Sequence, residues 1–590
     1  MTDLGDAAAI GAACRSGQLD PRRLIAEVLQ RVAESERPEA WIHRASAAEV
    51  EAQLVQIESL RSAGRELPLF GVPFAVKDNI DVAGMPTTAG CPAFAYVPEK
   101  DATAVAALRQ AGAICVGKTH MDQFATGLVG TRSPHGPCRN AVDPQYIAGG
   151  SSSGSAVVVA QGLVSFALGT DTAGSGRVPA AMNGIIGLKP TRGLLSVRGV
   201  VPACLSLDCV SVFSASVATA GMVLRCLLTI PPDHFLCRRR KPSQPRLKRF
   251  RFGVPSVGEL ADLSPAVVEL YERALARLSA IGGERVEIDY RPFLRTSSLL
   301  YEGPWVAERY AAVGEFLEAH PDDIDPVVGR IILGGRDVSG RQVFEGEYEL
   351  ARLKAATAAT WTSVDLLALP TVTKLLKIDE VLGQPVTTNQ ALGRHHNFVN
   401  LLDLSACVVR AGRWPEGIPF GLTLVAPAFA EDCLLDLAAR LEHEGPTAAI
   451  VDDTDRIRFV VVGAHLRGMP LSGDLLRSGG RFEAEVRTAP RYRLFALSGT
   501  QPAKPGLCRV ENGGVTIAAE IWSLPADAFG SFVAAIPRPL GMGRLILDDG
   551  SELPGFICEP EGLTGATDIS SFGGWRAYIE ATRAVANKTP

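Results

Sequence analysis

Glycine and serine crowd one stretch of the chain, which runs from Gly149 to Arg192. It begins with GGSSSGS and continues through GTDTAGSGR, so two turns of small residues each carry serine hydroxyls. Glycine lets the backbone N–H groups of such a turn converge on an anion, above all where the turn opens a helix. The composition therefore predicts that two serines meet with little bulk between them, beside a turn that holds an oxyanion.

A serine nucleophile needs a base, which is usually histidine and sometimes lysine. This stretch contains no histidine, but Lys77 ends the strand-like run GVPFAVK and is followed by Asp78 and Asn79 in an expected loop. A lysine buried at the end of a strand keeps part of its amine neutral, because desolvation disfavours the charged form. The alternative, on composition alone, is a strand-end lysine that pairs with Asp78.

Four motifs in chain order, GVPFAVKDN, GGSSSGS, GTDTAGSGRVPA and GLKPTRG, resemble the amidase signature family, which hydrolyses amides with a Ser, cis-Ser, Lys triad. The spacing also matches that family, with 74 residues from Lys77 to Ser151 and 24 from there to Ser175. The resemblance implies that Ser175 is the nucleophile, Ser151 the bridging serine after a cis peptide, and Lys77 the base. It further implies an oxyanion hole built by the backbone of Thr172, Ala173, Gly174 and Ser175.

One variant within these motifs, AGSGR where many members have GGSIR, resembles the allophanate hydrolases of the family. The run YEGPWVAERY resembles their specificity element, which implies that Tyr301 and Arg309 bind a small anionic substrate. Arginine suits a carboxylate because its planar fork binds both oxygens. On one continuous helix the two residues would lie about 80° apart around the axis and ~12 Å apart along it. The alternative is a packed tyrosine and a surface pair of Arg309 with Glu308 or Glu302.

Two further segments carry the resemblance. Residues 117–130 are similar to the part of the family that lines the substrate cleft with glycine backbone, which implies that Gly127 contacts substrate. His120 stands where the family has asparagine, so we expect a surface or core histidine there. The run VVGAHLRGMPL, residues 461–471, resembles the gamma-glutamylcyclotransferase-like C-terminal domain of allophanate hydrolases. This makes His465 a candidate site residue that meets an anion or shuttles a proton, and the alternative is a hydrogen-bonded structural histidine.

Two other motif matches compete with this interpretation. GAICVGKT, residues 112–119, satisfies the phosphate-loop pattern, but its apolar, strand-like centre leaves no loop to wrap a phosphate. GSSSG, residues 150–154, fits the GxSxG pattern of a Ser-His-Asp hydrolase that would use Ser152. Its histidine would be His395, His396 or His443. No convincing strand precedes the motif, so this hydrolase is the weaker alternative.

The elements that position these residues follow a helix and strand alternation typical of α/β folds. Helix starts are predicted at Asp20-Pro21, at the capping box of Ser46 with Glu49, and at Ser264-Pro265. The expected architecture is the amidase signature fold, a mixed β-sheet core covered by helices on both faces, plus a smaller C-terminal α+β domain. The expected domains are residues 1–450 and 456–590, joined by the polar segment 444–455.

Composition narrows the possible partners and compartments. The 590 residues are 47% hydrophobic with net charge −5, which allows two or three domains and gives no electrostatic case for nucleic acid or an anionic membrane. Twelve cysteines without a CxxC pattern predict reduced thiols, with no metal and no disulfide framework. No signal region or 18-residue apolar run occurs, so we expect a soluble cytoplasmic protein. The basic segment 238–251 is expected to be a solvated connection, and the alternative is a localisation or anion-binding patch.

The resemblance implies hydrolysis of allophanate (urea-1-carboxylate) to ammonia and carbon dioxide through a seryl acyl-enzyme, with N-carboxycarbamate as the first product and no cofactor. A homodimer is the expected assembly. The alternatives are a general small-amide amidase, the amidase subunit of an amidotransferase, or an interaction subunit that docks a urea carboxylase. The chain contains no biotin-attachment sequence MKM, so any carboxylation would occur on another chain.

Overall fold

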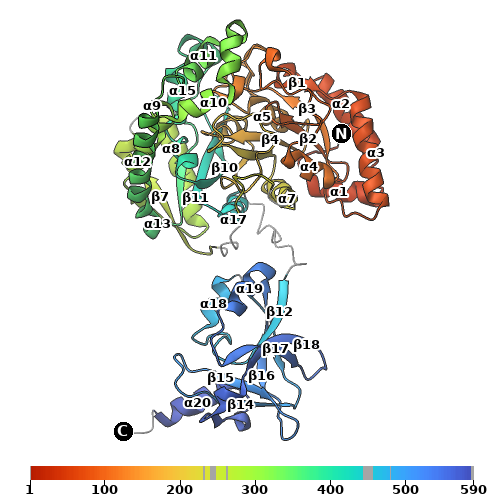
Figure 1. Cartoon of the computed structure of the whole chain (residues 1–590), viewed down its shortest axis with the longest axis vertical. Helices are drawn as coiled ribbons and strands as arrows, with labels where there is room; N and C mark the ends of the chain where they lie inside the picture. The colour runs from red at the N-terminus through yellow and green to blue at the C-terminus, as the bar shows by residue number, and fades with distance from the viewer. Residues whose placement is uncertain are drawn as a thin grey trace. The chain divides into compact units, whose positions relative to one another are not determined.

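The computed structural model describes residues 2–229, 233–239, 247–260, 263–442, 456–478 and 480–586. These residues form two compact units, one up to residue 442 and one from residue 456 onwards (Figure 1). Each unit is described by itself. The predicted linker 444–455, His443 and residues 240–246 of the basic segment lie outside the described residues.

Eleven strands within the described part of the first unit form one mixed sheet. Parallel pairs, such as β2 with β3 and with β4, flank a run of antiparallel pairs that begins with β4 and β6. In spatial order the strands are β1 (Trp41–Arg44), β3 (Ile114–Thr119), β2 (Pro73–Lys77), β4 (Phe166–Asp171), β6 (Cys209–Ser214), β5 (Ile186–Lys189), β10 (Leu404–Arg413), β11 (Pro419–Pro427), β9 (Leu366–Pro370), β7 (Phe250–Pro255) and β8 (Gly283–Ile288).

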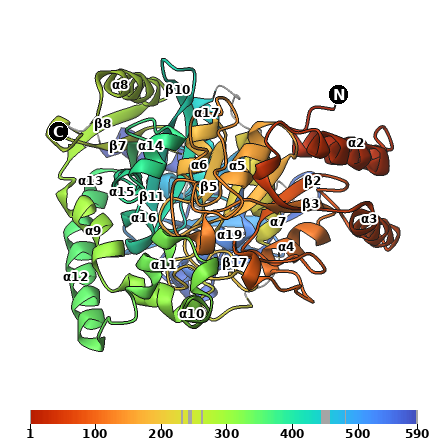
Figure 2. The same cartoon turned by 90° about the horizontal axis from the view of Figure 1, so that it is seen from above.

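The central strands are buried along their whole length, which requires cover on both faces of the sheet. Helices supply it (Figures 1 and 2). Those of the first unit are α1 (Ala7–Ser16), α2 (Pro21–Ala33), α3 (Ala47–Ser62), α4 (Thr103–Gln110), α5 (Ser153–Ala160), α6 (Val178–Asn183), α7 (Val217–Leu227), α8 (Pro265–Ala280), α9 (Arg291–Glu302), α10 (Trp305–Ala319), α11 (Pro326–Leu333), α12 (Gly340–Ala358), α13 (Thr360–Ser363), α14 (Ile378–Gly383), α15 (Thr387–Gly393), α16 (Phe398–Leu401) and α17 (Glu431–Leu441). The expected fold class is therefore confirmed for this unit.

The helix starts predicted from capping residues are confirmed. The Asp20 side chain accepts from the amide of Arg22 at the start of α2, and Ser264 caps α8. Ser46 and Glu49 form both bonds of a capping box at α3. Local side-chain chemistry decides these positions, so a single sequence is enough to find them.

The second unit has a five-stranded sheet in the order β13-β16-β12-β18-β17 and a three-stranded sheet in the order β15-β14-β19. Its strands are β12 (Arg456–Val461), β13 (Arg481–Arg487), β14 (Tyr492–Ala496), β15 (Pro505–Arg509), β16 (Ala518–Pro525), β17 (Leu540–Ile546), β18 (Glu552–Cys558) and β19 (Thr567–Asp568). Its helices are α18 (Ser472–Arg477), α19 (Ala526–Ala534) and α20 (Trp575–Ala586). This is the smaller α+β domain that was expected. Across the described residues of both units, no helix is long and apolar enough to cross a membrane.

Candidate active site

Parallel strands β2 and β4 bring the serines and the lysine together. The two strands are neighbours, with Val76 opposite Leu168, so Lys77 and Asp171 both sit at the carboxyl edge of the sheet. The glycine-serine turn around residues 150–152 leads into α5, and the turn 172–177 leads into α6. Two helix-opening turns thus meet the end of a buried strand, where parallel sheets commonly hold their ligands.

A continuous hydrogen-bonded chain links Lys77, Ser151 and Ser175. Lys77 Nζ lies 2.8 Å from Ser151 Oγ, and Ser151 Oγ lies 2.9 Å from Ser175 Oγ. Lys77 and Ser151 are fully buried, and only 3% of Ser175 is exposed. Lys77 Nζ also donates to Thr170 Oγ1 at 2.7 Å, and the peptide bond before Ser151 is cis. The three side chains singled out in the sequence therefore lie in one row.

Burial sets the charge of Lys77. Desolvation lowers the pKa of its amine from 10.5 to about 7, although Asp122, Asp208 and Asp171 raise it in part. The charge of Arg309 adds to the lowering. No carboxylate of the described residues forms an ion pair with Lys77, so near neutral pH the amine is partly neutral and able to accept a proton.

The turn that carries Ser175 is fixed by Asp171. Its carboxylate accepts from the amide of Gly174 at 2.8 Å and from the amide of Gly176 at 2.9 Å. In this arrangement the N–H of Gly174 is engaged by Asp171, and the oxyanion hole expected at residues 172–175 stays a prediction. Among the described residues, the amides of the other three residues of the expected hole meet no protein acceptor: Thr172, Ala173 and Ser175.

Arg177 holds the Asp171 carboxylate in place. Two bonds of 2.9 Å join the guanidinium to both carboxylate oxygens, and both side chains are fully buried. Burial alone would raise the pKa of Asp171, but the charge and hydrogen bonds of Arg177 lower it to about 2. Arg177 also donates to the carbonyl of His396 and to the side chain of Asn400. The nucleophile turn is therefore tied to α16 and the residues that precede it.

A second buried carboxylate supports the turn from another side. Asp208 accepts from Thr172 Oγ1 at 2.5 Å and from the amides of Ala203 and Cys204. Burial raises the pKa of Asp208 to about 6, although these hydrogen bonds oppose the shift. Because Thr172 is held by its side chain, its backbone direction is fixed beside Ser175.

The segment around Gly127 backs the turn of Ser151. Asp122 accepts from the amides of Gly130 and Arg132, and its own amide donates to the carbonyl of Ser151. A Cβ added to Gly127 would lie 2.6 Å from the Asp122 carboxylate, which leaves no room for a side chain. Gly127 is thus a close-packed backbone position next to the site. Its contact with a substrate remains a prediction.

Arg309 and Tyr301 come together from two helices rather than from one continuous helix. Tyr301 belongs to α9 and Arg309 to α10, because Gly303-Pro304 interrupts the helix between them. The guanidinium lies 5.6 Å from the centre of the Tyr301 ring and donates to Thr126 Oγ1 at 2.9 Å. Arg309 is 1% exposed, its Nε has no hydrogen-bond partner, and no carboxylate of the described residues pairs with it. The surface pair with a neighbouring glutamate is excluded, since Glu308 instead binds Ser206.

The competing motifs receive structural roles. Ser152 Oγ donates to the carbonyl of Thr170, while His396 binds the carbonyl of Thr371. His395 contacts Tyr290, whereas the third histidine, His443, lies outside the described residues. The phosphate-loop match is strand β3, in which the buried Lys118 pairs with Asp78. His120 is a core histidine between Ser153 and the carbonyl of Gly136.

Several residues of this site were not found from the sequence: Asn79, Asp122, Thr170, Asp171, Arg177, Asp208, His396 and Asn400. Two of them, Thr170 and Asp171, lie inside the motif GTDTAGS, so their nearness to the serines was the available signal. Arg177 ends the longer run GTDTAGSGR and Asn79 ends GVPFAVKDN, so the same signal was available for them. Asp208 and Asn400 instead bind Thr172 and Arg177 across 36 and 223 residues, and no local pattern marks those contacts.

A separate cavity of about 680 Å³ lies in the second unit, and His465 lines it. The imidazole stacks on the Phe556 ring, with centroids 5.3 Å apart. Burial lowers the pKa of His465 to about 4, so the ring is neutral at physiological pH. Polar side chains that share the cavity include Asp474, Lys504 and Ser531.

Comparison with known proteins follows the same division of the chain. The amidase family model matches residues 23–435, and the model of the allophanate hydrolase C-terminal domain matches residues 457–580. One glutamyl-tRNA(Gln) amidotransferase subunit, from Halobacterium salinarum, is 35% identical over 64% of this chain and 96% of its own length. That similarity is confined to a part of the chain about as long as the first unit.

Two longer similarities cover both units. Urea amidolyase of Saccharomyces cerevisiae is 43% identical over 92% of this chain, and the chain spans 31% of that protein's length. The solved structure of Kluyveromyces lactis allophanate hydrolase superimposes with a TM-score of 0.81 at 39% identity, covering 98% of this chain and 100% of that one. The arrangement of the two parts along the chain is therefore shared with a protein of the same length.

Proposed function

Because the chain belongs to the amidase family, we propose that its first unit hydrolyses a small amide through Lys77, Ser151 and Ser175, and that this amide is allophanate. The similarity to an allophanate hydrolase over 98% of the chain supports this substrate. The similarity to an amidotransferase subunit covers only 64% and leaves the second unit without a role. We therefore rank allophanate above the general amides and amidotransferase substrates.

The reaction that the geometry supports begins with the neutral amine of Lys77. Lys77 takes a proton from Ser151, which takes one from Ser175, and Ser175 Oγ attacks the terminal amide carbonyl. The free amides of the nucleophile turn stabilise the negative oxygen of the tetrahedral intermediate. Removing one comparable donor from an oxyanion hole raises the activation free energy by about 2.7–4 kcal/mol. The proton then returns to the leaving nitrogen and ammonia departs. Water, activated by the same relay, releases N-carboxycarbamate from the acyl-enzyme.

Recognition of an anion rests on one observation: the buried guanidinium of Arg309 leaves its Nε without a hydrogen-bond partner and meets no carboxylate at ion-pair distance among the described residues. Asp208 and Glu308 favour its charge only from a distance, so a ligand of opposite charge best explains its position. Arg309 is close enough to Lys77 for its charge to lower the pKa of the amine. A carboxylate bound at Arg309 would leave the far end of a short substrate at the serines. Allophanate is a short amide of this kind.

Biuret tests this assignment, because it is the neutral relative of allophanate with an amide in place of the carboxylate. We expect Arg309→Met to lower kcat/KM for allophanate by about 10²-fold or more, from the loss of a charge-assisted pair. The value for biuret should change only a few-fold, and Arg309→Lys should fall between. Arg336→Met removes a surface arginine paired with Glu318 and serves as the matched control. An unchanged preference for allophanate over biuret in Arg309→Met would contradict the proposal.

We propose that the second unit acts on the first product. N-carboxycarbamate carries two negative charges, and the cavity offers Lys504 for charge and the neutral ring of His465 for proton exchange. The resemblance of residues 461–471 to the C-terminal domain of allophanate hydrolases supports a role in the loss of carbon dioxide. Gly127 in the first unit is proposed to line the path of the substrate.

The remaining expectations concern partners and compartment. The matching part makes up 31% of yeast urea amidolyase, so we propose that a urea carboxylase supplies allophanate here. All twelve cysteines are free, which agrees with a reducing compartment such as the cytoplasm. We propose a homodimer as the assembly.

A further inference from the structure

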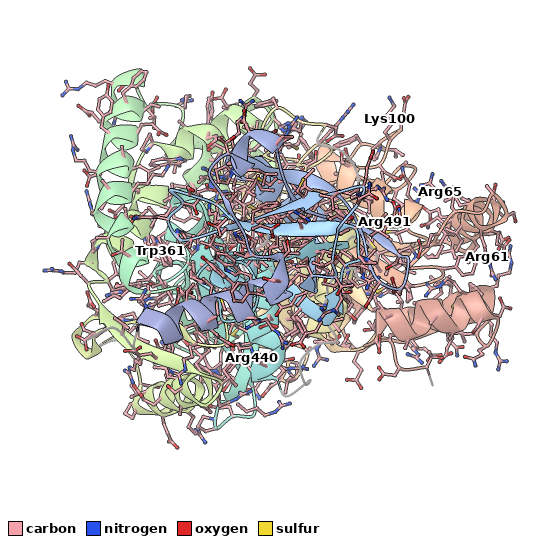
Figure 3. The ribbon with its side chains drawn as sticks, turned by 90° about the horizontal axis from the view of Figure 1, so that it is seen from below. Arg61, Arg65, Lys100, Trp361, Arg440 and Arg491 are labelled. Carbon is pink, nitrogen blue, oxygen red and sulfur yellow. The ribbon has the colours of Figure 1, made fainter. Side chains whose placement is uncertain are left out.

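Thr126 lies between two buried arginines. Arginine usually lies at the surface, as Arg61 and Arg65 do at the edge of the first unit in Figure 3. Arg309 and Arg132 are instead only 1% and 2% exposed. Nη1 of Arg309 donates to the Thr126 hydroxyl at 2.9 Å, and Nη1 of Arg132 donates to the Thr126 carbonyl at 2.9 Å. One residue therefore binds two guanidinium groups that the fold has removed from water.

The hydroxyl of Thr126 has one fixed hydrogen-bonding pattern. It must accept from Arg309, because a guanidinium offers donors and no acceptor. Its own hydrogen is donated to the carbonyl of Phe124, 3.1 Å away. Thr126 is fully buried, so these two bonds fix its side chain and, through Nη1, the plane of the Arg309 guanidinium. Valine has nearly the same shape but makes neither bond, whereas serine can make both.

The bond to Thr126 leaves one edge of the Arg309 guanidinium open. Nη1 lies on the side of the group that faces Cδ, whereas Nε and Nη2 share the opposite edge. Among the described residues, Nε has no hydrogen-bond partner and Nη1 is the nitrogen that bonds to protein. Two parallel N–H groups on one edge match the two oxygens of a carboxylate. The open edge is therefore the one that suits a bidentate carboxylate.

Thr126 follows two residues in an unfavourable backbone conformation. Phe124 and Ala125 have φ values of 49° and 52°, in the left-handed region that favours glycine. Such a conformation costs free energy and persists only where the surrounding structure holds it. Part of this support is the Gln123 side chain, which donates to the carbonyl of Asp323 at 2.8 Å. The strained backbone thus lies directly before the residue that binds the guanidinium.

Helix α10 meets this segment at two points on one face. Arg309 and Phe316 lie seven residues apart on α10, which is close to two full turns of a helix. Phe316 packs against Phe124, with ring centres 6.0 Å apart, and Arg309 reaches Thr126. The apolar contact holds the helix against the segment, and the hydroxyl then holds the guanidinium.

We propose that Thr126 is a positioning residue for substrate recognition, whose hydroxyl fixes the Arg309 guanidinium with its Nε and Nη2 edge towards the substrate carboxylate. This inference rests on the proposed function, in which Arg309 binds the carboxylate of allophanate. Loss of the hydroxyl lets the guanidinium rotate but leaves Lys77 and the serines in place. The affinity for a carboxylate should then fall, while the affinity for a neutral amide should not.

Binding of two isosteric probes tests this role apart from hydrolysis. Malonamate has carbon in place of the central nitrogen of allophanate and keeps its carboxylate, and malonamide is the neutral relative. The parent is the Ser175→Ala chain, which cannot form the acyl-enzyme. By isothermal titration calorimetry we expect Thr126→Val to weaken malonamate binding by about tenfold, from the loss of a hydrogen bond to a charged group, and malonamide binding by less than about twofold. Thr126→Ser keeps the hydroxyl and should bind both probes as the parent does.

Thr219→Val is the matched control. Thr219 is also a buried threonine whose hydroxyl donates to a backbone carbonyl, that of Gly5 at 3.0 Å, but it lies outside the candidate active site. Its substitution should leave the affinities for both probes unchanged. Thermal melting of each variant checks that the fold is retained. If Thr126→Val keeps the preference of the parent for malonamate, or Thr126→Ser loses it, the hydroxyl has no such role.

Arg309→Met separates this inference from the proposed function. A parent chain that does not prefer malonamate to malonamide, or that keeps the preference in Arg309→Met, would contradict both. A preference that Arg309→Met abolishes and Thr126→Val leaves intact would overturn the role of Thr126 alone. Because the hydroxyl acts through the guanidinium, adding Thr126→Val to Arg309→Met should not weaken malonamate binding further, and a further loss would contradict the inference.

Discussion

The charge state of one lysine should set the pH dependence of the reaction. Lys77 must be neutral to accept a proton, and burial lowers its pKa to about 7. We therefore expect kcat/KM to fall as the pH falls through about 7, by up to tenfold for each further pH unit. Ammonia release measured between about pH 5.5 and pH 9 checks this limb. A profile that stays flat to the lower end would remove Lys77 as the base.

Because Lys77 is buried, we also expect it to lower the free energy of unfolding. Its pKa is 10.5 in the unfolded chain and about 7 in the folded chain, so the folded state binds fewer protons between these values. The free energy of unfolding therefore decreases as the pH falls from about 10.5 to 7, because the unfolded chain binds the extra proton. Lys77→Met should abolish hydrolysis and raise the free energy of unfolding, by a few kcal/mol at about pH 6 and by little at about pH 10, since one pKa unit is about 1.4 kcal/mol.

Lys118 gives the matched comparison for that variant. It is also a fully buried lysine, on the neighbouring strand β3, but it pairs with Asp78. Lys118→Met leaves the buried carboxylate without its partner and should destabilise the fold by about 3–5 kcal/mol. Urea unfolding at both pH values separates the two cases. If Lys77→Met also destabilises the chain at low pH, the argument from desolvation is wrong.

The sequence was informative at the residue scale wherever the signal was local. Lys77, Ser151 and Ser175 each stand in a short motif, and the resemblance of these motifs to the amidase signature family brought them into one prediction. Asn400 binds the carbonyl of Asp171 across 229 residues, and no pattern near it points to that contact. The family resemblance placed Gly174 among the oxyanion donors, whereas the direction of its amide depends on the Asp171 carboxylate, for which the sequence predicted no role.

At the scale of the element, the turn before α6 depends on glycine. Gly174 has a φ of 125°, and a Cβ there would lie 2.9 Å from the Cβ of His396. Gly174→Ala should displace the turn, lower kcat at least tenfold, and destabilise the fold by roughly 1–3 kcal/mol. Steady-state kinetics and urea unfolding measure both effects. Gly162→Ala is the control, because that glycine has a φ of 65° and open space around it, so stability should fall slightly and kcat should not. Equal values of kcat in the two variants would contradict the claim that the turn positions Ser175.

Element boundaries were predictable where side chains cap the backbone and less so elsewhere. The starts of α2, α3 and α8 follow from Asp20, Ser46 and Ser264. The break between α9 and α10 was not predicted, although Gly303-Pro304 is a helix-breaking pair. The prediction used only the spacing of Tyr301 and Arg309, which assumes one continuous helix. Strand β16 begins at Ala518, although the β-favouring residues Val515 and Ile517 precede it, since tertiary pairing rather than propensity decides where a strand begins.

At the scale of the whole molecule, two units with different chemistry share one chain. The first holds the basic amine, the serines and a buried arginine, and the proposed mechanism uses all of them for amide hydrolysis. The second holds a cavity whose His465 is neutral, because burial lowers its pKa to about 4. A neutral ring offers one N–H donor and one acceptor nitrogen to a ligand, while Lys504 in the same cavity attracts an anion.

This division predicts that the two steps can be separated by one substitution. His465→Ala in the full chain should leave the first release of ammonia from allophanate unchanged, because that step belongs to the first unit. N-carboxycarbamate should then accumulate, which carbon-13 NMR of labelled allophanate would detect as a transient signal absent from the native protein. His320→Ala removes a half-exposed histidine of the first unit and should show no transient. If His465→Ala yields carbon dioxide as promptly as the native chain, the second unit does not act on this product, whereas slower ammonia release would place His465 in the first step instead.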